Sequence, residues 1–199
     1  MVSDAQTIGV YDARAEEYAD LTSGIAQDPR LIDFIERLPD GGRVLDLGCG
    51  PGAAAAVMAQ SGRDVLAWDA SQGMVELAAR GAGVTAQHRV FDDLAELEGD
   101  SLAGVWANFS LLHASRAALP GYLRQIAHTL MPGGVFLMAV KSGEGEERDK
   151  IGRHYTYFTE EELRARLHEA GFTPVRFDQG RDTGLSGEDA DWISLTCVV

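Results

Sequence analysis

The chain has 199 residues, which is enough for one domain with its own hydrophobic core. Its formal charge of −14 disfavours nonspecific attraction to nucleic-acid phosphates, and its 45% hydrophobic residues are ordinary for a soluble protein. The two cysteines, Cys49 and Cys197, form no CxxC pair, so we expect neither a disulfide framework nor a metal site. Residues 1–20 contain no apolar signal-peptide core and no apolar run is long enough to cross a bilayer, so we expect a cytoplasmic protein.

Strand-like and helix-like patterns alternate along the chain. The predicted helices cover residues 11–21, 30–38, 53–60, 72–80, 117–130 and 160–170. The predicted strands cover residues 44–47, 64–69, 84–88, 102–108, 135–140, 173–177 and 192–198. Ser71 and Thr159 are suitable N-caps for the helices that follow them, and residues 178–189 predict a Gly/Asp-rich loop.

This alternation predicts an α/β fold of the doubly wound, Rossmann-like class. We expect a mostly parallel seven-stranded sheet with an antiparallel last strand and N-terminal capping helices. In such folds ligands bind outside the carboxyl ends of the strands. Four polar or glycine-rich segments fall at these predicted ends: 48–52, Asp69, 91–93 and 108–113.

The segment after the first predicted strand indicates a nucleotide-type cofactor site. Gly48, Gly50 and Gly52 allow a tight turn that brings bare backbone against a ligand. The alanine-rich helix that follows would direct its first N–H groups at the same ligand. Asp69, at the end of the second strand, is placed to accept hydrogen bonds from two ribose hydroxyls.

The order of these motifs resembles that of class I S-adenosylmethionine (SAM)-dependent methyltransferases. The resemblance covers nearly the whole chain and is strongest to the small-molecule branch that includes the ubiquinone- and menaquinone-biosynthesis enzymes. The segments that carry it are 44–52 (VLDLGCGPG), 105–113 (VWANFSLLH), 130–135 (LMPGGV) and 157–172 (YFTEEELRARLHEAGF). It implies SAM as cofactor, S-adenosylhomocysteine as its product, and a small-molecule methyl acceptor.

The resemblance also implies a set of cofactor-binding residues. Asp46 would support the turn and the methionine ammonium, Asn108 would lie by the sulfonium, and Asp92 would contact the adenine amino group. The full set is Tyr11, Tyr18, Asp46, Gly48, Cys49, Gly50, Asp69, Ala70, Met74, Phe91, Asp92, Asn108 and Phe109. Two alternatives stay open, namely that Asp92 lies in a solvated turn and that the two tyrosines only pack between helices.

The candidate catalytic residues are His113, Arg153 and Tyr155. His113 follows the fourth strand, where a histidine can take a proton from a hydroxyl or thiol, although it can equally be a helix-start residue. Residues 141–158 mix basic and aromatic side chains, which suits a lid over an anionic acceptor, with the Arg153 fork on a carboxylate. The alternative is a solvated loop.

We expect a single domain at 1–199, divided into a helical cap (1–40), a cofactor-binding core (41–140), a candidate substrate lid (141–158) and a C-terminal part (159–199). It would act on its acceptor as a monomer or homodimer, without a nucleic-acid or membrane partner. Two other functions remain open: a NAD-dependent oxidoreductase and a non-catalytic SAM-binding domain. The first is disfavoured because the third glycine, Gly52, falls one position early for G-x-G-x-x-G.

Overall fold

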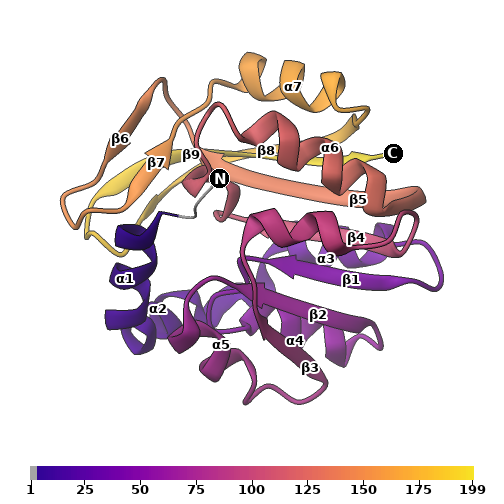
Figure 1. The fold of residues 1–199 in the computed structure, drawn as a ribbon, viewed down its shortest axis with the longest axis horizontal. Helices are drawn as coiled ribbons and strands as arrows, with labels where there is room; N and C mark the ends of the chain where they lie inside the picture. Colours follow the sequence, from indigo (N-terminus) through magenta and orange to yellow (C-terminus); the bar gives the residue numbers. More distant parts are fainter. Residues whose placement is uncertain (1–3) are drawn as a thin grey trace.

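The computed structural model describes residues 4–199 and is built on a seven-stranded sheet with the strand order β3-β2-β1-β4-β5-β9-β8 (Figure 1). The strands are β1 (Arg43–Leu47), β2 (Asp64–Asp69), β3 (Val84–His88), β4 (Leu102–Asn108), β5 (Leu130–Lys141), β8 (Thr173–Thr183) and β9 (Asp189–Val198). The first five are mutually parallel, whereas β9 pairs antiparallel with both β5 and β8. The predicted seven-stranded sheet with an antiparallel last strand is confirmed.

Helices cover both faces of this sheet (Figure 1). They are α1 (Ala5–Ala13), α2 (Ala15–Thr22), α3 (Pro29–Arg37), α4 (Ala53–Gln60), α5 (Gln72–Ala78), α6 (Leu119–Thr129) and α7 (Glu160–Glu169), with short 3₁₀ turns at Ser23–Gln27, Phe91–Glu96 and Leu111–His113. Val44 belongs to an apolar cluster that includes side chains of α3 and α4, and its neighbour Leu45 belongs to a second cluster that includes side chains of α6 and α7. Both faces of the central strands are therefore buried, as expected for a parallel sheet covered by helices.

Several predicted boundaries were wrong. The predicted helix 11–21 is two helices, because Arg14 leaves the helical conformation (φ −126°, ψ 26°) between α1 and α2. Strand β5 begins at Leu130 rather than Val135, since Leu130 already pairs with Leu102. Helix α6 begins at Leu119, two residues late, with a proline in its first turn.

Most of the predicted loop 178–189 is also strand. Strand β8 continues to Thr183 and pairs with β9 over this length. The indole of Trp192, on β9, lies against Gly180. A Cβ added to Gly180 would lie 2.5 Å from an atom of the indole ring. Asp182 accepts a hydrogen bond from the Trp192 indole N–H. The Gly/Asp composition that favoured a loop therefore belongs to an edge strand whose polar residues face solvent and this indole.

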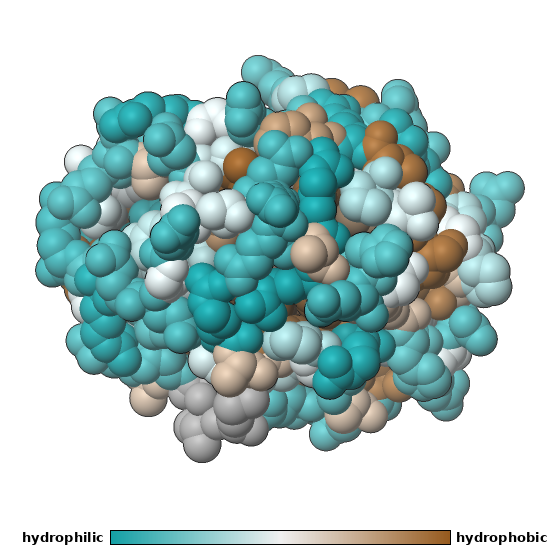
Figure 2. All heavy atoms as spheres, turned by 90° about the horizontal axis from the view of Figure 1, so that it is seen from above, coloured by the Kyte–Doolittle hydropathy of each residue, from teal (hydrophilic) through white to brown (hydrophobic). Residues whose placement is uncertain are grey.

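The candidate lid, residues 141–158, contains a two-stranded antiparallel sheet of β6 (Glu146–Arg148) and β7 (His154–Thr156), which lies near α1 (Figure 1). No helix in residues 4–199 combines the length and the apolar character needed to cross a membrane. The face in Figure 2 is mostly hydrophilic, and its hydrophobic residues are scattered in small groups.

Candidate functional site

The turn between β1 and α4 depends on glycine at three positions. Gly48, Gly50 and Gly52 all have positive φ, at 73°, 53° and 82°. An added Cβ at Gly48 would meet the Cβ of Ser110 at 2.3 Å, and one at Gly50 would meet the ring of Tyr18 at 3.2 Å. The chain therefore keeps bare backbone where the carboxyl ends of β1 and β4 meet.

Asp69 lies beside this turn at the end of β2. Its two carboxylate oxygens accept hydrogen bonds from the backbone N–H groups of Gly50 and Ser71, each at 2.8 Å. Burial raises the pKa of Asp69, and these two backbone bonds oppose that rise. The carboxylate is thereby fixed in position and retains lone pairs for a ligand.

A cavity of about 360 Å³ opens at this edge of the sheet. It brings together most of the residues that the sequence indicated. The predicted residues that line it are Tyr11, Tyr18, Gly48, Gly50, Asp69, Ala70, Met74, Phe91, Asn108, Phe109 and His113. We call it the first cavity.

Three predicted cofactor residues do not line the first cavity. Asp46 lies below the turn, where burial raises its pKa to about 8, and its Oδ2 atom has no hydrogen-bond partner among the described residues. Cys49 is also buried, which raises the pKa of its thiol. Asp92 is exposed, and it accepts a hydrogen bond at 2.7 Å from the hydroxyl of Tyr122, which does line the cavity.

The loop after β4 carries backbone strain and orphan polar atoms. Phe109 has a φ of 58°, a conformation that is uncommon for a residue with a side chain. Asn108 Oδ1 and Ser110 Oγ are buried without a hydrogen-bond partner among residues 4–199, and both residues line the first cavity. Because buried polar atoms are normally paired, these two fit a polar ligand in the cavity.

His113 is neutral and is held at both ring nitrogens. Nδ1 lies 2.6 Å from the carbonyl oxygen of His154, which can only accept, so Nδ1 is the protonated nitrogen. Nε2 therefore accepts from the hydroxyl of Tyr11 at 2.9 Å. Burial lowers the pKa of His113 to about 4.

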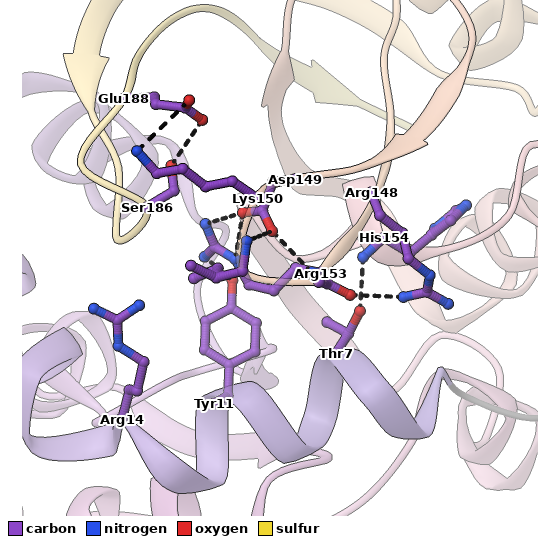
Figure 3. Close-up of polar contacts among 12 residues, drawn as sticks. Thr7, Tyr11, Arg14, Arg148, Asp149, Lys150, Arg153, His154, Ser186 and Glu188 are labelled. Carbon is purple, nitrogen blue, oxygen red and sulfur yellow. Dashed lines mark hydrogen bonds and ion pairs between the residues drawn. The ribbon is translucent and has the colours of Figure 1, made fainter.

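Arg153 extends this network and corrects one expectation (Figure 3). Its Nη1 donates to the Tyr11 hydroxyl at 3.0 Å, while Nε and Nη2 donate to Asp149 Oδ2 at 3.0 and 2.8 Å. The side chain is nearly inaccessible to solvent. The predicted pairing of the Arg153 fork with a substrate carboxylate does not fit, because Asp149 already occupies the fork.

Segment 141–158 makes two further contacts with α1 and its N-cap residue (Figure 3). Arg148 forms an ion pair with Asp4 at 2.8 Å, and the backbone N–H of His154 donates to the Thr7 hydroxyl at 2.8 Å. All four residues line the first cavity. Residues of the N-terminal helices and of segment 141–158 therefore line this cavity together.

A second cavity, of about 160 Å³, adjoins the first. Tyr11, Tyr18 and Phe109 line both. The candidate catalytic residues Arg153 and Tyr155 line only the second, so the structure separates them from Asp69 and the glycine turn.

A family model described as a methyltransferase domain matches residues 22–176. The chain belongs to this methyltransferase family. The family and the fold predicted from the sequence are thus confirmed.

Curated relatives agree with this membership. The chain is 32% identical over 155 residues to the cypemycin N-terminal methyltransferase of Streptomyces sp, which covers 74% of this chain and 63% of that protein. It is 33% identical over 116 residues to the ubiquinone biosynthesis O-methyltransferase of Sinorhizobium medicae, covering 57% of this chain and 45% of that protein. The chain thus spans less than two thirds of the length of these relatives.

A solved structure resembles the whole chain. It is the 1,6-didemethyltoxoflavin-N1-methyltransferase of Burkholderia thailandensis, crystallised with 1,6-didemethyltoxoflavin and S-adenosylhomocysteine. The TM-score is 0.76 at 27% identity, and the match covers 98% of this chain and 87% of that one.

Sequence reasoning missed two residues near the second cavity. Trp192 lines the cavity and was predicted only as the first residue of the last strand. Arg30 is buried behind it, with its guanidinium carbon 4.5 Å from the centre of the Trp192 ring. No local pattern indicated either role, because the contact joins residues that are far apart along the chain.

Proposed function

We propose that this protein is a SAM-dependent methyltransferase that methylates a small-molecule acceptor. The observation that carries the proposal is the fixed Asp69 carboxylate beside the glycine turn, which lines a cavity large enough for a nucleoside. Membership of the methyltransferase family and the relative with bound S-adenosylhomocysteine support the cofactor.

The residues present fit this cofactor. Asp69 would accept hydrogen bonds from the ribose hydroxyls, and Phe91 would flank the base with Asp92 at the rim. The unpaired Oδ1 atom of Asn108 would accept a hydrogen bond from the positively charged methionine end of the cofactor. Asp46, which lies beneath the glycine turn, would support the turn and the methionine ammonium. Met74 would pack against the adenosine.

When bound, SAM supplies an electrophilic methyl group, whose bond to sulfur breaks with the electron pair left on the neutral thioether product. The chain's own residues then have to orient the acceptor and exclude water. Tyr11, His113 and Arg153 form one fixed unit between the two cavities. Since the pKa of His113 is about 4, this histidine is a weak base at neutral pH, and we assign it to positioning Tyr11.

The remaining features of the proposal are finer. We keep the chain as a single domain with a cap at 1–40, a core at 41–140, a lid at 141–158 and a C-terminal part at 159–199. We further propose that the methyl acceptor is anionic, that the protein is a monomer or a homodimer, and that it works in the cytoplasm. The closed contacts between the lid and α1 support the lid assignment.

Calorimetric titration with S-adenosylhomocysteine and with NAD tests the cofactor. We expect micromolar binding of the first and none of the second, with Asp69→Asn weakening the first by about tenfold, as for loss of a charge-assisted hydrogen bond. Asp64→Asn is the matched control, because Asp64 lies exposed at the opposite end of the same strand. Binding of NAD alone would favour the oxidoreductase, and conversion of SAM with an acceptor separates an enzyme from a non-catalytic binding domain.

A further inference from the structure

The second cavity has aromatic walls. Five aromatic side chains line it: Tyr11, Tyr18, Phe109, Tyr155 and Trp192. Its volume of about 160 Å³ is close to that of an engineered protein cavity of about 150 Å³ that binds benzene. A small planar ring system therefore fits it in both size and surface.

Trp192 presents a fixed face to this cavity. Its indole N–H donates to Asp182 Oδ2 at 2.6 Å, and the guanidinium of Arg30 stacks on the ring at 4.5 Å. Gly180 lies against the indole, and Phe109 meets it edge to face with ring centres 6.1 Å apart. The wall is therefore organised before any ligand enters, which reduces the entropy cost of binding a flat molecule.

Lys141 brings a positive charge to the same cavity. It is the last residue of β5, pairs in register with Trp192, and holds Nζ 4.2 Å from the centre of the Tyr155 ring. Among the described residues, no carboxylate lies within 4.0 Å of this ammonium group. Arg153 also lines this cavity, but the carboxylate of Asp149 offsets its charge, so Lys141 is the cation that is available to a ligand there.

The acidic groups around Lys141 have other partners or lie at a distance. Asp149, in the loop between β6 and β7, is bound to Arg153, and Glu188, between β8 and β9, pairs with Lys150 at 3.6 Å. Asp182, which lines the second cavity, accepts a hydrogen bond from the indole N–H of Trp192. Glu147 on β6 is exposed and acts on Lys141 only through weak Coulomb attraction. Burial and Arg153 together lower the pKa of Lys141, as expected for a cation that lacks a close counter-ion.

We propose that the second cavity binds the methyl acceptor as the anion of a planar aromatic or heteroaromatic ring with an acidic O–H or N–H, and that Lys141 is its counter-ion. The inference rests on the proposed function, since it names the acceptor class for that same site. The acceptor loses its acidic proton to solvent water and binds through its anionic oxygen or nitrogen. That atom supplies the electron pair for the new bond to the methyl carbon.

The test uses 4-nitrophenol, a planar phenol whose phenolate is coloured. The probe is titrated by absorbance from acid to alkaline pH, free and with excess protein saturated with S-adenosylhomocysteine. We expect the bound probe to ionise about one pKa unit lower than the free probe, which corresponds to about tenfold tighter binding of the phenolate than of the phenol. This readout requires no methyl transfer.

Lys141→Met removes the charge and keeps much of the side-chain length, so we expect it to abolish the shift, while Lys141→Arg retains it. Lys150→Met is the matched control, because Lys150 is the other lysine of the chain and lines neither cavity. The inference is wrong if the bound probe ionises like the free probe, if it does not bind, or if both Met variants reduce the shift equally. Failure of S-adenosylhomocysteine itself to bind would instead contradict the proposed function, because Lys141 does not line the first cavity.

Discussion

The hydroxyl of Tyr11 lies 2.9 Å from Nε2 of His113, and this hydrogen bond joins α1 to the loop after β4. The same hydroxyl accepts from Arg153, a residue of the lid. A single phenol thus connects α1, segment 141–158 and the loop at the edge of the sheet. It also lies between the two cavities, one assigned to the cofactor and the other to the acceptor.

Tyr11→Phe removes this connection. The buried Nε2 of His113 and Nη1 of Arg153 would each lose a partner, so we expect the free energy of unfolding to fall by about 1–3 kcal/mol. Urea denaturation measures the change. Tyr18→Phe is the control, because the Tyr18 hydroxyl makes no hydrogen bond within residues 4–199 while its ring packs against Tyr11 at 5.4 Å. Equal destabilisation by the two variants would mean that the hydroxyl network contributes nothing.

His113 should make stability depend on pH. Its pKa is about 4 in the folded protein against an ordinary value of 6.5, so between these values the unfolded chain binds more protons. The contribution of the neutral ring is therefore complete above about pH 6.5 and is lost as the pH falls towards 4. Urea denaturation gives the free energy of unfolding of the wild type and of His113→Gln at several pH values. The difference between the two proteins at each pH isolates the contribution of His113, because the other titrating groups are the same in both. Parallel profiles would contradict the assigned neutral ring.

Gly50→Ala should weaken cofactor binding. The new Cβ would lie 3.2 Å from the Tyr18 ring, at a φ of 53° that already strains an alanine. We expect S-adenosylhomocysteine to bind about tenfold more weakly by calorimetry. Gly62→Ala shares the positive φ, at 89°, but meets no atom within 4 Å, so it should lose stability without losing affinity. The account fails here if the two variants bind equally well.

Arg148→Ala should loosen the closure of the first cavity. It removes the ion pair with Asp4 that holds the lid to α1, so we expect S-adenosylhomocysteine to dissociate about threefold faster in stopped-flow measurements. High salt should have the same effect on the wild type, since the pair is partly exposed. Arg181→Ala breaks the exposed pair with Asp191, neither of which lines the first cavity, and it should leave dissociation unchanged.

The sheet, the glycine turn and Asp69 could be predicted because each rests on a local pattern. A buried strand, glycines at fixed spacing and an acidic residue at the next strand end can all be recognised within a few tens of residues. The parallel order then requires these ends to meet.

The lid and the second cavity could not be predicted in the same way. The pairing of Arg153 with Asp149 depends on an irregular loop conformation, which no helical or strand periodicity encodes. Trp192, Lys141 and Arg30 come together only through the pairing of β5 with β9 and the packing of α3. The composition of residues 178–189 suggested a loop. In the structure, the indole of Trp192 leaves no room for a side chain at Gly180, and its N–H group donates a hydrogen bond to Asp182.

A crystal structure of the protein with S-adenosylhomocysteine tests the central claim most directly. The account predicts density for the adenosyl group in the first cavity, with ribose oxygens within hydrogen-bond distance of Asp69 and the homocysteine end near Asn108. Density for the ligand elsewhere, or an Asp69 carboxylate that makes no contact with the ribose, would contradict it.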